Sequence, residues 1–182
     1  MARRTGGRPG RSADPGAELR SMLAEGLRVA SDHDVLILLK PGPGQLLGSV
    51  DDALRLRVEL DHPNLGFVLD PAGFLAPLGP EEWPNAIDRM VAQVGPWCPV
   101  VHAKDLRQVQ GQVGLPRLGQ GVLDYGRVMR QLRRYQPHPL VILEHLRPSE
   151  LPEAKRCLEE AVLGGSQAQE SPQRTQNAQS AT

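Results

Sequence analysis

Four short apolar runs, each followed by an amphipathic segment, constrain the fold of this 182-residue chain more than any other feature. Each run is almost continuously hydrophobic, which is typical of strands that are covered on both faces. The runs are Val35–Leu39, Gly66–Leu69, Val100–Val101 leading into His102, and Leu140–Leu143. Because strands that alternate with helices favour a parallel sheet with right-handed crossovers, the sequence predicts an α/β fold.

The segments after the runs carry apolar residues at helical spacing and begin with recognisable start signals. One more helix is predicted before the first strand, so the predicted order is α(βα)₄. Four such units make a partial TIM (β/α)₈ barrel, since the complete barrel needs roughly 250 residues. The predicted start signals are Asp14 with Pro15, the capping box of Ser49 and Asp52, Pro80, Asp124 and Ser149.

The two ends of the chain differ in composition from the predicted domain, which spans residues 14–163. Residues 1–13 form a basic arm of mostly Gly and Arg, and residues 164–182 form a polar tail of low complexity. Segments with so few apolar side chains cannot offset the entropy of ordering, so we expect both to be disordered.

The overall composition excludes several classes of function. The 21 basic and 21 acidic residues balance, which gives no general attraction to nucleic acid or to an anionic membrane. No apolar run is long enough to span a bilayer, and no apolar segment of a secretory signal follows the basic start. Cys98 and Cys157 form no CxxC pair, which fits a reducing compartment. We therefore expect a soluble, cytoplasmic protein with neither a nucleic-acid nor a membrane partner.

An ionisable residue stands at the C-terminal end of each predicted strand. In a parallel α/β sheet, ligands and chemistry collect at this edge. Asp, His and Glu together would suit Mn²⁺, Mg²⁺, Co²⁺ or Zn²⁺. Taken singly, these residues also have structural explanations: Asp70 before Pro71 can cap a helix, and Glu144 can pair with Arg147. The four residues are Lys40, Asp70, His102 and Glu144.

Four segments in the stretch from Asp34 to Val162 carry a recognisable pattern. They read HPNLGFVLDPAGF, VVHAKD, LPRLGQGVLDYGRVMRQLRR and PLVILEHL. In this order they resemble the C-terminal half of the xylose-isomerase-like sugar-phosphate isomerase/epimerase superfamily. The resemblance implies a half barrel, a divalent-metal cofactor and a small carbohydrate substrate, either a sugar or a sugar phosphate.

The resemblance also implies roles for individual residues. Asp70, His102 and Glu144 would hold the metal, which polarises a substrate carbonyl, while Glu144 would also move the proton beside it. Lys104 and Asp105 of the H-x-K-D segment would line the cavity and contact the substrate. In the next loop, close approach of the backbone is the simple explanation for Gly119 and Gly121.

The sequence departs from the family pattern at the first strand, where Lys40 stands in place of a glutamate ligand. Either the metal site is lost or weakened, or the Lys40 ammonium replaces part of the metal's charge and serves as a second base with a pKa lowered by burial. His145 is predicted to face away from Glu144, because side chains alternate along a strand. Two functions therefore remain open: a metal-dependent isomerase or epimerase, and a non-catalytic module that binds a ligand or a protein.

An isolated half barrel would expose unpaired strand edges and an apolar inner face. Three outcomes are open for this chain. It pairs with another copy as a homo-oligomer, it joins a separate N-terminal half barrel, or it is a truncated product of poor solubility.

Overall fold

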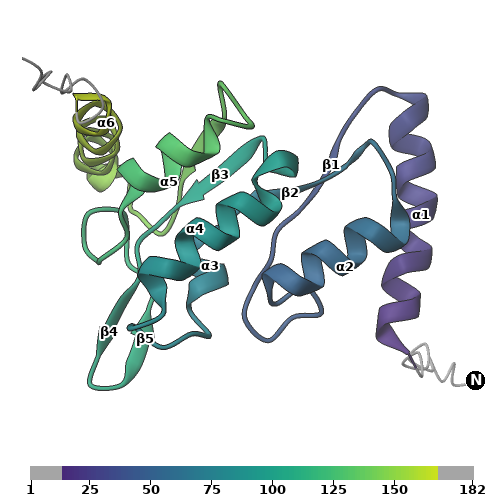
Figure 1. Cartoon of the computed structure of the whole chain (residues 1–182), viewed down its shortest axis with the longest axis horizontal. Coiled ribbons are helices and arrows are strands. Elements are labelled where there is room, and N and C mark those ends of the chain that lie inside the picture. Colours follow the sequence, from purple (N-terminus) through teal and green to yellow (C-terminus); the bar gives the residue numbers. More distant parts are fainter. Residues whose placement is uncertain (1–13, 168–182) are drawn as a thin grey trace, which may run out of the picture.

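The computed structural model describes residues 14–167 and shows a parallel sheet with helices on one side and at both ends (Figure 1). The predicted arm lies outside the described residues, as does the tail beyond Gln167, and the last helix runs past the predicted domain end at residue 163. The elements are α1 (Pro15–Asp32), β1 (Ile37–Leu39), α2 (Val50–Leu60), β2 (Leu65–Leu69), α3 (Pro71–Leu75), α4 (Trp83–Val94), η1 (Gly95–Trp97), β3 (Val100–Ala103), β4 (Arg107–Val109), β5 (Gln112–Gly114), α5 (Tyr125–Leu132), β6 (Leu140–Leu143), η2 (Pro148–Glu150) and α6 (Leu151–Gln167).

The main sheet contains four parallel strands in the order β1-β2-β3-β6. The four strands lie side by side in the order in which they follow along the chain, with only the β4–β5 hairpin intervening, as in a barrel that winds in one direction. The predicted α/β fold with about four strand–helix units is therefore confirmed. None of the described helices is long and apolar enough to cross a membrane.

Three of the predicted helix starts are confirmed in atomic detail. The Asp14 carboxylate accepts from two backbone N–H groups at the start of α1. Ser49 and Asp52 form the complete capping box of α2, and Asp124 accepts from a backbone N–H at the start of α5. These polar side chains satisfy the first N–H groups of each helix, which have no partner within the helix itself.

Two predicted helix starts are wrong, and in both places a glutamate explains the shift. Pro80 lies in a turn, and α4 begins at Trp83. The turn is closed by the Glu82 carboxylate, which accepts the backbone N–H of Gly79 at 3.1 Å. Ser149 lies inside η2, where the Glu150 carboxylate accepts the N–H three residues before it (2.8 Å). Each glutamate closes a turn, so the α-helix starts later than the sequence signal suggested.

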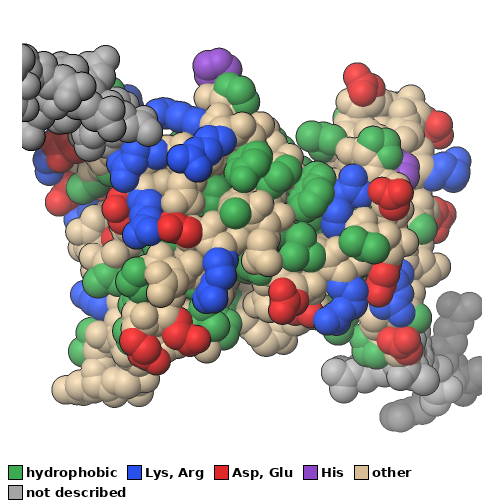
Figure 2. Space-filling model, in the orientation of Figure 1, with side chains coloured by type: hydrophobic (Ala, Val, Ile, Leu, Met, Phe, Trp, Pro, Cys, Tyr) green, Lys and Arg blue, Asp and Glu red, His purple; other side chains and the backbone are tan. Residues whose placement is uncertain are grey.

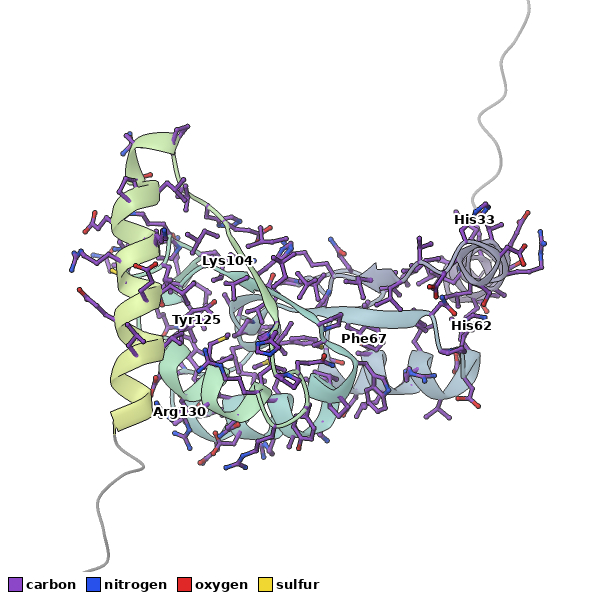
Figure 3. All side chains as sticks on the ribbon, turned by 90° about the horizontal axis from the view of Figure 1, so that it is seen from above. His33, His62, Phe67, Lys104, Tyr125 and Arg130 are labelled. Atoms are coloured by element: carbon purple, nitrogen blue, oxygen red, sulfur yellow. The ribbon has the colours of Figure 1, made fainter. Side chains whose placement is uncertain are left out.

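Alternate strand residues face opposite sides of the sheet. One side packs against the helices in the hydrophobic core through Ile37, Leu39, Phe67, Leu69, Val101, Ala103, Val141 and Leu143. The other side, which we call the open face, has no described helix over it, as the view from above shows (Figure 3). Figure 2 shows the helix-covered side, where hydrophobic side chains gather between charged ones at the two ends. The apolar residues of the open face are Leu38, Val68, Val100, Leu140 and Ile142 in the strands and Leu36 directly before β1.

The antiparallel hairpin of β4 and β5 was not predicted. Its two-residue turn, Gln110–Gly111, has φ angles of 51° and 78°, which a type I′ turn requires at both positions. The glycine was the only signal for it. The hairpin is local and exposed, and it stands beside the C-terminal edge of the sheet.

The loop between β5 and α5 depends on two glycines. Gly119 has a φ of 87°, and a Cβ on Gly121 would overlap the carbonyl oxygen of Leu106. The predicted close approach of the backbone is therefore confirmed.

We expect Gly121→Ala to lower the free energy of unfolding by about 1–3 kcal/mol, because backbone atoms must move to admit the methyl group. Gly114→Ala is the matched control, since the nearest atom to its added Cβ lies 3.8 Å away. Urea unfolding of the two variants and the wild type measures the difference. Equal midpoints for Gly121→Ala and Gly114→Ala would contradict this account of the loop.

Candidate functional site

Five ionisable side chains meet at the C-terminal end of the sheet. The strand register places them on the open face, in the layer above its apolar residues. Figure 3 shows Lys104 on this side of the sheet, with Tyr125 close to it. The five residues are Lys40, Asp70, His102, Lys104 and Glu144.

Two ammonium groups bridge two carboxylates in this cluster. Lys104 Nζ donates to Asp70 Oδ2 and to Glu144 Oε2, the latter at 2.8 Å. Lys40 Nζ donates to both oxygens of Glu144 at 3.0 Å and lies 3.7 Å from Asp70 Oδ2. His102 Nδ1 is 2.8 Å from Glu144 Oε1, but at an angle outside hydrogen-bond geometry. With a neutral imidazole, the cluster carries no net charge.

The centre of the cluster is almost completely buried. The side chains of Lys104 and Asp70 are 3% and 2% exposed, whereas that of Lys40 is 39% exposed. Asp70 also accepts the backbone N–H of Gly73 at 2.9 Å and so caps α3, as its position before a proline suggested. Each Asp70 oxygen therefore has a donor, which a carboxylate in such a position requires.

The pairing of Glu144 sets the protonation states of the site. Burial raises the pKa of Glu144, but the hydrogen bonds from Lys104 and Lys40 outweigh it and lower that pKa to about 2. Burial lowers the pKa of Lys40, but its hydrogen bond to Glu144 and the charge of Asp70 outweigh it, so the pKa is raised. The predicted lowering of the Lys40 pKa is therefore wrong, because two carboxylates lie beside this partly exposed side chain.

The backbone at Lys104 is held by a tyrosine from α5. The Tyr125 hydroxyl donates to the carbonyl oxygen of Lys104 at 2.6 Å and accepts its N–H at 3.1 Å. Burial raises the pKa of Tyr125 well above its ordinary value, so the hydroxyl stays protonated. In the sequence, Tyr125 is simply one residue of the amphipathic segment that follows Asp124, and no local signal identifies its polar partner.

Asp105 faces the loop rather than the pocket. Its two oxygens accept the backbone N–H groups of Leu106, Gly119 and Leu123 at 2.9–3.0 Å, and the residue is 2% exposed. These three bonds position the loop that precedes α5. The substrate contact expected for Asp105 has no support in this arrangement, whereas Lys104 reaches the pocket next to the cluster.

A pocket of about 320 Å³ lies against the cluster. Its wall includes His145, which was predicted to face away from Glu144. That prediction is wrong: the strand ends at Leu143, and His145 adopts a left-handed φ of 57°, so strand alternation no longer applies. The His145 ring instead lies 2.6 Å from the carbonyl oxygen of Leu115. The lining residues are Lys40, Pro41, Gly42, Pro43, Gln45, Asp70, Gly73, Lys104, Leu115 and His145.

The pairing of Glu144 with Arg147, which the sequence left open, is not formed. Arg147 instead contacts Glu150 at 3.4 Å. The Glu144 carboxylate therefore accepts hydrogen bonds from both lysines, and no ion pair with Arg147 competes with them.

The predicted metal ligands do not fit a divalent cation in this arrangement. Ammonium groups bond to Asp70 and Glu144, and Lys40 places a positive charge where an anionic ligand would stand. Among residues 14–167, no group of three or more His, Cys, Asp and Glu side chains is arranged to hold a metal ion. The metal-binding role of Asp70, His102 and Glu144 stays a prediction, and the geometry argues against it.

Comparison with known proteins identifies the family. The profile of the xylose isomerase-like TIM barrel family matches residues 5–161, so the chain belongs to this family. The resemblance found in the sequence is therefore confirmed. No curated protein matches the chain.

Solved structures share the fold. A xylose isomerase-like TIM barrel protein from Mycobacterium smegmatis in complex with magnesium is 22% identical, with a TM-score of 0.64, over 88% of this chain and 54% of that one. A xylose isomerase domain protein from Planctomyces limnophilus is 21% identical (TM-score 0.65; 88% and 57%), and a D-tagatose 3-epimerase-like protein is also 21% identical (TM-score 0.65; 82% and 55%). The chain thus spans about half the length of these proteins, and at this identity the likeness concerns the fold.

We expect Lys104→Met to cost about 3–5 kcal/mol of unfolding free energy, because it leaves the buried Asp70 carboxylate without its cation. Lys40→Met should cost less than about 1 kcal/mol, since that side chain is partly exposed and Glu144 keeps Lys104. Urea unfolding at pH 7 compares the two. In the double variant Asp70→Asn/Lys104→Met, part of the loss should return; equal losses for the two lysine variants would refute the buried pair.

The lowered pKa of Glu144 predicts a defined dependence of stability on pH. Its folded pKa of about 2 lies below the ordinary 4.5, so the ionised carboxylate stabilises the fold above about pH 4.5. This contribution is lost as the pH falls towards 2. The difference in unfolding free energy between wild type and Glu144→Gln should therefore shrink over that interval. A difference that stays constant from pH 6 to pH 2 would show that Glu144 is not paired in solution.

Proposed function

We propose that this chain is a metal-free, non-catalytic module that binds a small hydroxylated compound, built on the fold of a sugar isomerase and epimerase family. The observation that carries the proposal is the pairing of Lys40 and Lys104 with Asp70 and Glu144. The two ammonium groups supply the positive charge that the carboxylates need. The site is therefore complete in charge without a cation.

The chemistry of the pocket supports a sugar or a close derivative as the ligand. A volume of about 320 Å³ suits a small molecule. Its wall offers ammonium donors, the amide of Gln45 and the imidazole of His145, all of which can bond hydroxyl or carbonyl oxygens. The two ammonium groups are paired with two carboxylates, so the lysines leave no surplus cation for a phosphate. An unphosphorylated sugar therefore fits better than a sugar phosphate.

The protonation states support binding rather than turnover. A general base works best with a pKa near the working pH. The pKa of Glu144 is about 2, which makes it a weak base, and the raised pKa of Lys40 keeps that group protonated. The Tyr125 hydroxyl also keeps its proton and is engaged with the backbone. None of these three groups suits the proton transfer of an isomerase at neutral pH.

A second candidate is the metal-dependent isomerisation or epimerisation of a small sugar. It is favoured by one observation: the three predicted ligands, Asp70, His102 and Glu144, stand at the ends of three neighbouring strands. A magnesium-bound relative shares the fold. For this chain to bind a metal there, Lys40 would have to leave the site and Lys104 would have to share both carboxylates with the metal.

Titration calorimetry with Mn²⁺ separates the two candidates. We expect no binding to the wild type and binding to Lys40→Glu, because that substitution removes an ammonium from the site and adds a carboxylate ligand. The double variant Lys40→Glu/Asp70→Asn is the control and should lose the gained binding. Circular dichroism establishes that each variant is folded.

Binding of the organic ligand is measured separately, by saturation-transfer NMR with small ketoses and aldoses in the presence of EDTA. The proposal expects binding that EDTA leaves unchanged and that Lys40→Met weakens. Mn²⁺ binding by the wild type, lost in Asp70→Asn, would overturn the proposal in favour of the metal-dependent isomerase. A sugar signal that appears only with Mn²⁺ would do the same.

A further inference from the structure

The apolar part of the open face is the largest feature that the site does not use. Leu36, Leu140 and Ile142 belong to the apolar residues of the open face, yet their side chains are 55%, 61% and 41% exposed. Leu36 directly precedes β1, and the other two lie in β6. These are the edge strands of the sheet, and their outer edges have no strand paired to them within residues 14–167. An apolar sheet face between two open edges is a surface that proteins normally cover.

The number of helices indicates what can cover it. In a complete barrel one helix lies outside each junction between neighbouring strands, so eight strands take eight helices. In residues 14–167, the four strands of the main sheet are accompanied by five helices of eight residues or more. The extra helix arises because α1 precedes β1 and packs against it, while α6 follows β6 and packs against that strand. Both ends of the sheet therefore already carry a helix (Figures 1 and 3).

A second copy of this chain does not fit the open edges. Closing two copies into a barrel would bring β6 of one copy beside β1 of the other at each of the two junctions. The α6 helix of the first copy and the α1 helix of the second would then occupy the same space outside the junction. Two copies bring ten long helices to eight junctions, so the inner faces could not close without displacing a helix.

From this count we propose that the open face and its edges bind a β(αβ)₃ unit of the same fold family, with four parallel strands joined by three helices. Such a unit begins and ends with a strand, so α6 covers one new junction and α1 covers the other. Added to the four sheet strands and five long helices of this chain, its four strands and three helices give eight strands and eight helices, so no helix is left over. The share of each solved relative that this chain leaves uncovered is a little under half, which is the size the unit requires.

The exposed surface of α1 agrees with this partner. Met22 and Val29 lie seven residues apart and so share one side of the helix, and they are 65% and 45% exposed. The last helix of the incoming unit would lie beside α1 and cover this stripe. The partner would also bring four more strand ends to the mouth where Lys40 and Lys104 stand, so the wall of the pocket is incomplete without it.

The first test uses the chain alone, by light scattering over a range of concentrations and by fluorescence of the dye ANS. We expect no closed dimer and strong ANS binding. The triple variant Leu36→Lys/Leu140→Lys/Ile142→Lys should lose most of the ANS signal yet melt at the wild-type temperature, since these side chains are exposed. Val58→Lys, on the outer side of α2 and 78% exposed, is the control and should keep the signal. A stable dimer that binds no ANS would overturn the proposal, and so would a monomer that binds none.

The second test supplies the missing unit. The part of the Planctomyces limnophilus relative that this chain does not cover is fused ahead of residue 14. We expect a monomeric chimera with little ANS binding and a higher melting temperature than the chain alone, and we expect the same chimera with the three lysines to lose both gains. A chimera that keeps the full ANS signal and melts no higher would overturn the proposal. Neither test depends on whether the pocket binds a sugar or a metal.

Discussion

The buried ion pair between Lys104 and Asp70 is the interaction on which the arrangement of the site depends. It joins the end of β3 to the end of β2, and the second oxygen of Asp70 extends the link to α3 by capping that helix. Tyr125 fixes the backbone of Lys104 from α5, and Glu144 brings in the end of β6. Each donor in this network has an acceptor, which is the condition under which a charged group is tolerated in such a position. The strand ends are therefore held together by hydrogen bonds that need no ion at their centre.

A single position explains how this site departs from a metal centre. With a glutamate in place of Lys40, the cluster would hold three carboxylates, one imidazole and one ammonium, an excess of negative charge that a divalent cation could balance. Lys40 reverses this balance and makes the cluster neutral. Hydrogen bonds from Lys104 and then from Lys40 lower the pKa of Glu144, and Glu144 together with Asp70 raises the pKa of Lys40. The ammonium group of Lys40 thus acts twice: it stands where the resemblance implies an anionic ligand, and it adds to the lowering of the Glu144 pKa.

The sequence predicted those parts of the fold that depend on local pattern. The four strands lie within two residues of the predicted runs, because buried strands show as continuous apolar segments. The convergence of Asp70, His102 and Glu144 at one edge followed from the order of the elements. The predictions that were wrong concerned features that depend on a backbone angle or on residues distant in the sequence. No local sequence pattern indicates the left-handed φ of His145. Nor does one indicate the ion pairs that raise the pKa of Lys40.

The two layers of the open face differ in how far they depend on a partner. In the upper layer, the two lysines and the two carboxylates balance in charge and are hydrogen-bonded to one another within the half barrel. The lower layer is apolar, and apolar side chains stabilise a fold only when they are removed from water. Leu36, Leu140 and Ile142 remain exposed to water in this chain. The proposed partner would therefore stabilise the hydrophobic layer, whereas the charged layer does not depend on it. It follows that closing the barrel would change the walls of the pocket while leaving the ion pairs beneath it intact.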